Sequence, residues 1–255
     1  MFTVAADAYD RFMGRYSVPL APPFAAFAGV RPGWSVLDVG AGPGALTGVL
    51  AGMVGAAGVT AVDPSEPFVA ANRERHPGVR VLAASAERLP FEDAAFDAAL
   101  AQLVVHFMAD PGGGVAEMAR VTRPGGVVAA CVWDFERGRA PLSAFWDAAQ
   151  AVDTESPGEG GRVGVRSGQL ASLFRAAGLA GIEEAEIGVT VEHESFDAWW
   201  QPMTLGVGPA GSWLVSRPQA VQDAIRDRLR AAYPGAPGIR TAVVWAARGV
   251  AGGGS

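Results

Sequence analysis

Short apolar runs alternate with amphipathic stretches along the chain as far as Trp133. The runs are predicted to be buried strands, because parallel strands that are covered on both faces read as near-continuous hydrophobic segments; they lie at 36–39, 58–63, 79–84, 96–101 and 127–133. The stretches between them that carry helix-start signals or helix-forming residues are predicted helices, at 45–53, 65–75 and 111–122. Alternating strands and helices predict a doubly wound α/β domain with a Rossmann-like sheet.

The regular alternation breaks after the strand that ends at Trp133. Helices are predicted at 142–152 and 168–177, a strand at 182–191, an aromatic helical region at 196–233 and a last strand at 240–247. A helical cap is therefore expected between the last two strands. The predicted N-terminal helical lid spans 1–30 and includes a short helix at 22–29. The predicted core spans 31–194, with a helical excursion at 135–166. The cap is predicted at 195–235, and a final strand with a frayed tail at 236–255.

A glycine-rich turn joins the first predicted strand to the helix that follows it. The pattern Gly40-x-Gly42-x-x-Ala45 fits a dinucleotide fingerprint, so NAD is a candidate ligand. Asp38, two residues before Gly40, favours a cationic ligand instead, because a carboxylate repels a pyrophosphate. S-adenosylmethionine (SAM), with its ammonium and sulfonium, is such a ligand. Asp63 ends the second strand, where an acid accepts hydrogen bonds from the ribose of either ligand or caps the next helix.

Composition and charge narrow the class of protein. The chain has 255 residues, half of them hydrophobic, which is enough for one large domain with a sizeable core. Its net charge of −6 argues against extended contact with nucleic acid or anionic lipid. The single cysteine, Cys131, fits a reducing cytoplasm and excludes a cysteine-cluster metal site, and no metal site is expected. Neither a signal peptide nor an apolar run of membrane-spanning length is evident, so a cytoplasmic protein is expected.

Several motifs together resemble the class I SAM-dependent methyltransferase family, in its small-molecule (type 11) group that includes quinone-biosynthesis enzymes. The motifs are the glycine stretch 36–44, the acid at 62–63, the loop 88–91 with 96–97, the turn 120–126 and the aromatic segment 9–16. The resemblance covers 9–133 well and the remainder loosely. It implies a seven-stranded sheet whose last strand is antiparallel, SAM as the cofactor and S-adenosylhomocysteine as the product.

The resemblance also implies a set of cofactor-binding residues. They are Tyr9, Arg15, Asp38, Gly40, Ala41, Gly42, Asp63, Pro64, Ser65, Ser85, Ala86, Glu87 and Gln102. Within this set, the two glycines let the backbone pass the methionine and ribose, and Asp63 holds the ribose hydroxyls. Pro64 or Ser65 flanks adenine opposite Ala86, and Gln102 lies near the methionine end.

One position departs from the family pattern. Many relatives have an aspartate before Ala86-Glu87, where it binds the adenine amino group, and this chain has Ser85. A hydroxyl can accept the same bond without charge. The lid residues Tyr9 and Arg15 are expected to close over the cofactor, with Arg15 pairing a carboxylate; the alternative is a helix packed on the edge of the core.

The molecule that accepts the methyl group is expected to bind near His106, which follows the fourth strand. His106 is a candidate general base or a packing partner of Phe107, while His76 and His193 are expected to be structural. An aromatic cover is predicted over the substrate, the alternative being a simple cap core; it comprises Phe145, Trp146, Trp199, Trp200 and Met203.

The leading hypothesis is a methyltransferase that acts on a small, partly apolar molecule, with the O, C or N acceptor atom left open. A non-methylating SAM-binding protein and an NAD-dependent oxidoreductase are the alternatives. The sequence does not separate a monomer from a homodimer.

Overall fold

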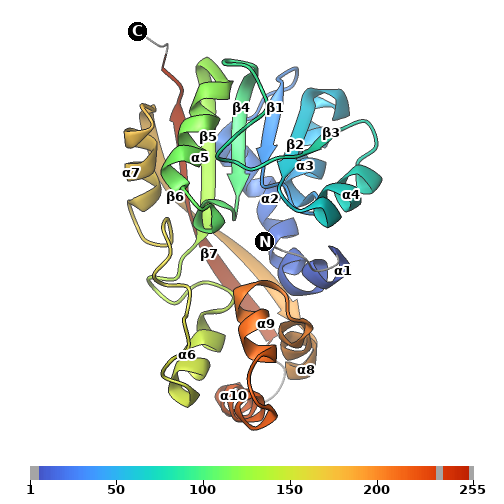
Figure 1. Cartoon of the computed structure of the whole chain (residues 1–255), viewed down its shortest axis with the longest axis vertical. Helices are drawn as coiled ribbons and strands as arrows, with labels where there is room; N and C mark the ends of the chain where they lie inside the picture. Colours follow the sequence, from blue (N-terminus) through green and yellow to red (C-terminus); the bar gives the residue numbers. More distant parts are fainter. Residues whose placement is uncertain (1–5, 234–237, 253–255) are drawn as a thin grey trace.

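The computed structural model describes residues 6–233 and 238–252, which form a layered α/β fold around one mixed sheet (Figure 1). The described strands lie in the order β3-β2-β1-β4-β5-β7-β6. Their bounds are β1 Val36–Val39, β2 Val59–Asp63, β3 Arg80–Ala83, β4 Phe96–Gln102, β5 Thr122–Trp133, β6 Ala180–His193 and β7 Gly238–Val250. Strand β7 pairs antiparallel with both β5 and β6, and the other neighbours pair in parallel. The predicted seven-stranded Rossmann-like sheet with an antiparallel last strand is confirmed.

Helices cover both faces of this sheet. On one face, α2 (Arg15–Ala28) and α3 (Ala45–Val54) share a buried cluster with alternate residues of β1, β4, β5 and β7. On the other face, α5 (Pro111–Val121) and α7 (Gln169–Ala176) pack on the intervening residues. Helix α4 (Glu66–Arg75) packs beside β2 and β3 at the end of the sheet. Each central strand is thus buried on both sides, as its unbroken apolar sequence predicts.

The segment before β1 differs from the predicted short helix at 22–29. It begins with α1 (Ala6–Tyr9), continues through a π-helical turn η1 (Asp10–Gly14) and runs into α2 without a break. Three prolines lie inside α2, namely Pro19, Pro22 and Pro23. An internal proline removes a helix hydrogen bond and costs about 3 kcal/mol, so packing must offset this cost.

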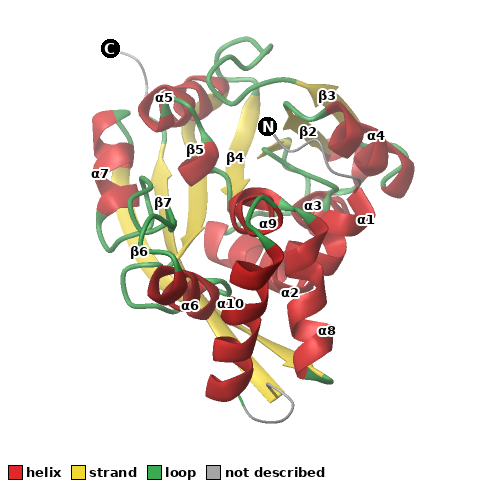
Figure 2. Cartoon of the chain, turned by 60° about the horizontal axis from the view of Figure 1, so that its bottom comes forward, coloured by secondary structure: helices red, strands yellow, loops and turns green. Residues whose placement is uncertain are grey.

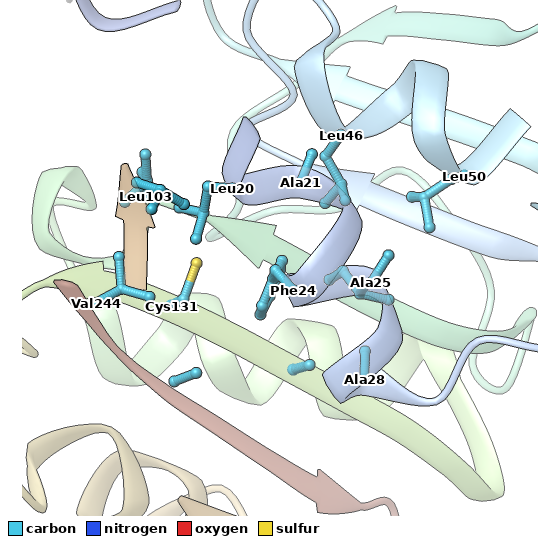
Figure 3. Packing of buried hydrophobic residues seen from close by; sticks show 14 of the residues in the cluster. Leu20, Ala21, Phe24, Ala25, Ala28, Leu46, Leu50, Leu103, Cys131 and Val244 are labelled. Carbon is cyan, nitrogen blue, oxygen red and sulfur yellow. The ribbon is translucent and has the colours of Figure 1, made fainter. Parts of the chain in front are cut away.

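The inner face of α2 provides that packing. Leu20, Phe24 and Ala25 are fully buried in a cluster with Leu46 and Leu50 of α3 and with residues of the sheet, and Leu20 lies beside Leu103 (Figure 3). Full burial of one leucine or phenylalanine contributes roughly 1.5–3 kcal/mol. Tertiary burial therefore overrides the local signal of the prolines.

The cap lies between β6 and β7 in the sequence, as predicted, and below the carboxyl edge of the sheet in Figure 1. It consists of α8 (Phe196–Trp200), η4 (Gln201–Leu205), α9 (Gly208–Val215) and α10 (Gln219–Ala232). Helix α6 (Ser143–Val152), which belongs to the predicted excursion of the core, packs against α10 and shares the cap's buried cluster (Figure 2). Strand β7 runs to Val250 and so extends into the stretch that was predicted to be a tail. Residues 1–5, 236–237 and 253–255 of the predicted end segments lie outside the described residues.

Candidate active site

The glycine loop joins β1 to α3 at the carboxyl edge of the sheet. Gly40 and Gly42 have φ angles of 66° and 55°, a left-handed conformation that suits glycine. A Cβ atom on Gly40 would lie 2.4 Å from Cγ2 of Val104, whereas a Cβ on Gly42 would meet nothing within 4 Å. The Ala41 N–H donates to the Val62 carbonyl at 2.9 Å and ties the loop to β2. The loop therefore packs on the protein at Gly40 and faces open space at Gly42.

Asp63, at the end of β2, holds the same loop in place by hydrogen bonds. Its carboxylate accepts hydrogen bonds from the Gly42 N–H at 2.9 Å and from the Ser65 N–H at 2.8 Å. Burial raises the pKa of Asp63, and the two backbone donors oppose the shift. A carboxylate has about four acceptor positions, so Asp63 can still accept from ligand hydroxyls.

Asp38 lies beneath the loop with only 1% of its surface exposed. Thr47 of α3 donates to its carboxylate at 2.6 Å, and Asn72 of α4 donates in turn to the Thr47 hydroxyl at 3.0 Å. Burial raises the pKa of Asp38 to about 7, and nearby Asp63 adds to the shift. Two carboxylates thus stand at adjacent strand ends, an arrangement that suits a cationic ligand.

This burial predicts a pH-dependent effect of Asp38→Asn on stability. The folded pKa of about 7 exceeds the ordinary aspartate pKa of 3.8, so the folded state holds the proton more tightly. The contribution of Asp38 to stability is present below the unfolded pKa and is lost as the pH rises through the folded pKa. In denaturant titrations, the variant should therefore gain stability relative to wild type between pH 4 and pH 8, by about 4 kcal/mol if the full shift is expressed. Asp227→Asn, at an exposed site, is the matched control; an equal pH dependence in both variants would refute the account.

The loop after β3 is organised by Glu87. Its carboxylate accepts from the Ser85 hydroxyl, from the Ala109 N–H at 2.8 Å and from the Asp110 N–H at 3.4 Å. These bonds hold the loop against the start of α5. Burial raises the pKa of Glu87, but the hydrogen bonds together outweigh it and lower the pKa. Ala86 is buried between them, while the Ser85 oxygen accepts from the Glu87 N–H at 3.3 Å and keeps one lone pair for a further donor.

Tyr9 and Gln102 approach the same edge from two elements. The Tyr9 ring packs edge-on against Phe68 of α4, with 5.2 Å between ring centroids. Burial raises the pKa of Tyr9, and the negative charge of nearby Asp63 adds to the shift. Gln102, the last residue of β4, donates to the Ser17 carbonyl at 2.9 Å. Its Oε1 atom is buried and has no hydrogen-bond partner among the described residues.

Arg15 faces the cap in this structure. Its guanidinium donates to the carbonyls of Ala198 at 3.2 Å and Trp199 at 3.1 Å, and it lies 3.4 Å from Nδ1 of His193. The hydroxyl of Tyr16 lies 3.0 Å from the other ring nitrogen of His193. The N-terminal helices are therefore tied to the cap, and the predicted contact of Arg15 with a ligand carboxylate stays a prediction.

A mostly apolar cavity of about 30 Å³ lies between the N-terminal helices, the loop after β4 and the cap. Its walls are Tyr9, Phe12, Met13, Leu103, His106, Phe107, Trp133, Phe135, Pro141, Leu142, Glu159, Gly208 and Pro209. Leu103 directly follows Gln102 and has a φ of 62°, which is uncommon outside glycine and marks a constrained backbone at this edge. The cavity therefore adjoins the strand ends that carry the candidate cofactor residues.

Besides Tyr9, the described wall of the cavity contains two acid–base groups, and His106 is the first of them. It is 5% exposed, its ring packs on Phe107 at 4.0 Å between centroids, and its Nδ1 has no hydrogen-bond partner among the described residues. Burial, with a smaller contribution from Arg162, lowers the pKa of His106 to about 3. The imidazole is therefore neutral near pH 7, and a general base with so low a pKa is weak. The predicted base role stays a prediction.

The second acid–base group is Glu159, in the irregular segment after α6. It is 3% exposed, and its carboxylate accepts from the Trp146 indole N–H at 2.9 Å. The Nε atom of Arg162 lies 3.7 Å from its other oxygen. Burial raises the pKa of Glu159, which the indole bond and Arg162 partly oppose.

The predicted substrate cover lies behind the wall of this cavity. Its five residues are buried in the core of the cap and are absent from the described lining of the cavity; they are Phe145, Trp146, Trp199, Trp200 and Met203. Trp146 is connected to the cavity wall indirectly, because its indole N–H donates to Glu159, which lines the cavity. These side chains therefore pack in the core of the cap, which is the alternative that the sequence analysis names. Their contact with a substrate stays a prediction.

Sequence reasoning missed the residues that line the cavity from other elements. Phe12 and Met13 belong to the aromatic segment 9–16, so their motif was visible although their role was not. Glu159 lies in a glycine-rich loop with no periodic signal. His76, expected to be structural, places Nε2 3.0 Å from the Gly44 carbonyl and thereby supports the glycine loop.

The site fits a SAM-like ligand on three observations. Open space stands over Gly42, where a ligand can approach the backbone. Gln102 offers a buried acceptor atom without a partner among the described residues. Asp63 supplies acceptors and negative charge, and Asp38 holds the loop from beneath through Thr47. Residues 6–233 and 238–252 hold no group of three or more side chains suited to a metal ion, and no helix within them is both long and apolar enough to cross a bilayer.

Comparisons with known proteins identify related chains. A family model described as a methyltransferase domain matches residues 37–130. A demethylmenaquinone methyltransferase of Clavibacter sepedonicus is 30% identical over 240 residues, which cover 86% of this chain and 94% of that protein. The YcgJ protein of Bacillus subtilis has a similar structure, with a TM-score of 0.60 and 19% identity over 94% of this chain and 99% of that one.

Other relatives match over a shorter length. A demethylmenaquinone methyltransferase of a Mycobacterium species is 37% identical over 138 residues, which cover 54% of this chain and 55% of that protein. Against four further relatives the match spans between 29% and 55% of their length. The chain thus spans about half or less of the length of these curated relatives, and the range matched by the family model, 37–130, contains the glycine loop.

Proposed function

Because the chain belongs to the class I SAM-dependent methyltransferase family, we propose that it transfers a methyl group from SAM to a small, partly apolar acceptor. SAM, when bound, supplies an electrophilic methyl group on a sulfonium. The observation that carries the proposal is that an apolar cavity adjoins the acidic glycine loop, because Tyr9 lines the cavity and also lies near Asp63, which holds the loop.

The cofactor residues take separate roles in this proposal. Asp63 accepts from the ribose hydroxyls, and Asp38 holds the loop through Thr47. Gly40 and Gly42 bring the backbone close to the ligand, and Gln102 offers its free acceptor to the methionine end. The adenine lies between Ala86 and the turn after β2, where Pro64, Ser65 and Ser85 flank it and Glu87 keeps the loop in place.

The chain contributes to methyl transfer mainly by positioning. Reactive groups held in line react faster because the entropy of bringing them together is already lost on binding. The N-terminal helices, tied to α4 by the 2.6 Å Arg75–Asp10 ion pair and to the cap by Arg15, form one wall of the cavity and exclude water. His106 presents a neutral imidazole that orients a polar atom of the acceptor.

The acceptor class follows from the cavity wall and from the relatives. Aromatic and aliphatic side chains make up most of the lining, which suits a ring. Relatives named demethylmenaquinone methyltransferase make a quinone-like ring the first class to test. A volume of about 30 Å³ holds little more than water, so the walls must part to admit such a ring.

The same proposal assigns residues 1–30 as the lid, 31–194 as the SAM-binding core, 195–235 as the cap and 236–255 as the final strand and tail. The partner is a small molecule, because the net charge of −6 gives no basic field for nucleic acid. A cytoplasmic location is proposed because Cys131, the single cysteine, is free and buried in β5.

The direct test is incubation of the protein with SAM and a panel of single-ring acceptors that carry hydroxyl, amine or activated ring carbon. Mass spectrometry should detect S-adenosylhomocysteine and an acceptor that is heavier by one methylene, in equal amounts. Tight SAM binding without turnover on any acceptor of the panel would favour the non-methylating SAM-binding alternative.

A further inference from the structure

Glu159 is a buried carboxylate in the wall of the acceptor cavity, and the loop that carries it is irregular. The segment between α6 and α7 places the side chain at 3% exposure, directly beside apolar neighbours of the cavity. A buried carboxylate is costly unless it is hydrogen-bonded and balanced by charge. A structural role alone does not require that carboxylate to border the cavity, so its position there needs an explanation.

Two side chains hold Glu159 in place. The Trp146 indole N–H donates to Oε2 at 2.9 Å, and Arg162 Nε lies 3.7 Å from Oε1. A carboxylate has about four acceptor positions, so these two contacts leave capacity toward the cavity.

Arg162 also fixes the other polar group of the wall. Its Nη1 donates to the His106 carbonyl at 3.1 Å, and its guanidinium stacks over Phe107 at 4.9 Å from the ring centroid. One arginine thus positions both Glu159 and the turn that carries His106. The His106 Nδ1 atom is buried and has no hydrogen-bond partner among the described residues, so it also awaits a polar group.

The charges in this wall cancel. Arg162 balances the Glu159 carboxylate, and the imidazole of His106 is neutral near pH 7 because burial lowers its pKa to about 3. A ring acid would meet the Glu159 carboxylate, and a ring ammonium would add a positive charge beside a carboxylate that Arg162 already balances. A neutral ring that carries one hydroxyl satisfies both polar groups, since it can donate to Glu159 while its oxygen faces His106.

From this geometry we infer that Glu159 is a specificity-determining residue, which together with His106 selects a neutral, hydroxyl-bearing ring as the acceptor. This inference rests on the proposed function, because it places the acceptor in the cavity beside the cofactor edge. It adds the charge state and the polar group of that acceptor.

The test measures binding of four probes that share a methyl-substituted benzene ring to the protein, with and without S-adenosylhomocysteine, by calorimetry. The probes are toluene and its derivatives with a hydroxyl, a carboxylate or an aminomethyl group opposite the methyl, namely p-cresol, p-toluate and 4-methylbenzylamine. Wild type should bind p-cresol about tenfold more tightly than each of the others. Glu159→Gln should lose that preference while its affinity for toluene stays within about twofold.

Glu155→Gln is the matched control, because Glu155 is an exposed glutamate in the same loop. It should keep the wild-type preference. Thermal unfolding checks that Glu159→Gln is folded, and the ranking of probes on wild type tests the inference even if that variant is not. The inference is overturned if p-cresol binds no more tightly than toluene, if either charged probe binds best, or if none binds.

The outcome separates this inference from the proposed function. Failure to bind S-adenosylhomocysteine would contradict the proposed function, whereas normal binding with no preference for p-cresol would contradict only the assignment of Glu159.

Discussion

Gly42→Ala is expected to leave the protein folded and to lower its affinity for SAM at least about 100-fold. A Cβ at this position meets no protein atom within 4 Å, so the variant has room in the ligand-free protein. The left-handed φ of 55° costs alanine roughly 1–2 kcal/mol of stability. The methyl group would occupy the space through which the cofactor is proposed to approach the backbone, so binding should suffer far more than folding.

Gly40→Ala provides the contrast within the same loop. Its Cβ would lie 2.4–2.5 Å from both γ carbons of Val104, closer than real contacts allow. Steric overlap of this kind costs about 1–3 kcal/mol in addition to the left-handed conformation. The main loss should therefore be in stability.

Denaturant unfolding and SAM calorimetry on both variants check this pair. Gly52→Ala, in α3, is the control, because its Cβ also meets nothing within 4 Å and the residue lies in a helix. If Gly42→Ala binds SAM as wild type does, the ligand does not pass over Gly42 and the proposed cofactor position is incorrect.

Asp63→Ala should lower SAM affinity by a similar factor for a different reason. The substitution removes the proposed acceptor of the ribose hydroxyls and also the carboxylate that holds the N–H groups of Gly42 and Ser65. Hydrogen bonds to a charged group contribute about 1.5–3 kcal/mol each. Loss of the ribose contacts and of the fixed loop together predicts a decrease of about 100-fold or more.

The stability of Asp63→Ala should change much less. The lost backbone bonds destabilise the variant, and removal of a buried carboxylate whose pKa is raised by burial offsets part of that loss. Glu66→Gln, in the first turn of α4 and exposed, is the matched control and should bind SAM normally. Comparable affinities of Asp63→Ala and wild type for SAM would show that Asp63 is only a helix cap.

The central sheet and the glycine loop were predictable because their signals are local. Apolar runs bounded by glycine and proline defined the parallel strands, and the family resemblance of the glycine stretch is confirmed. Asp38 and Asp63 stand at strand ends, where sequence position alone fixes their place at the edge of a parallel sheet.

The acceptor side was less predictable because it depends on contacts between distant segments. The prolines of α2 suggested a break, yet burial of Leu20 and Phe24 maintains the helix. Arg15 suggested a ligand contact, but α8, which contributes its carbonyl partners, lies more than 180 positions later in the chain. Glu159 carries no periodic or motif signal, and its contacts with Trp146 and Arg162 hold it at the cavity.

The aromatic residues of the cap illustrate the same limit. Their density predicted an apolar cover, and they do form a buried cluster. Sequence spacing could not tell which rings face the cavity, because helix orientation in the cap is set by packing between α6, α8, α9 and α10. The cavity wall instead takes Phe12, Trp133 and Phe135 from other elements.

A calorimetric titration of the purified protein with SAM and, separately, with NAD tests the central claim most directly. The acidic loop built on Asp38 and Asp63 predicts saturable binding of one SAM per chain at micromolar concentration and no measurable heat with NAD. Micromolar binding of NAD in the absence of SAM binding would contradict the account.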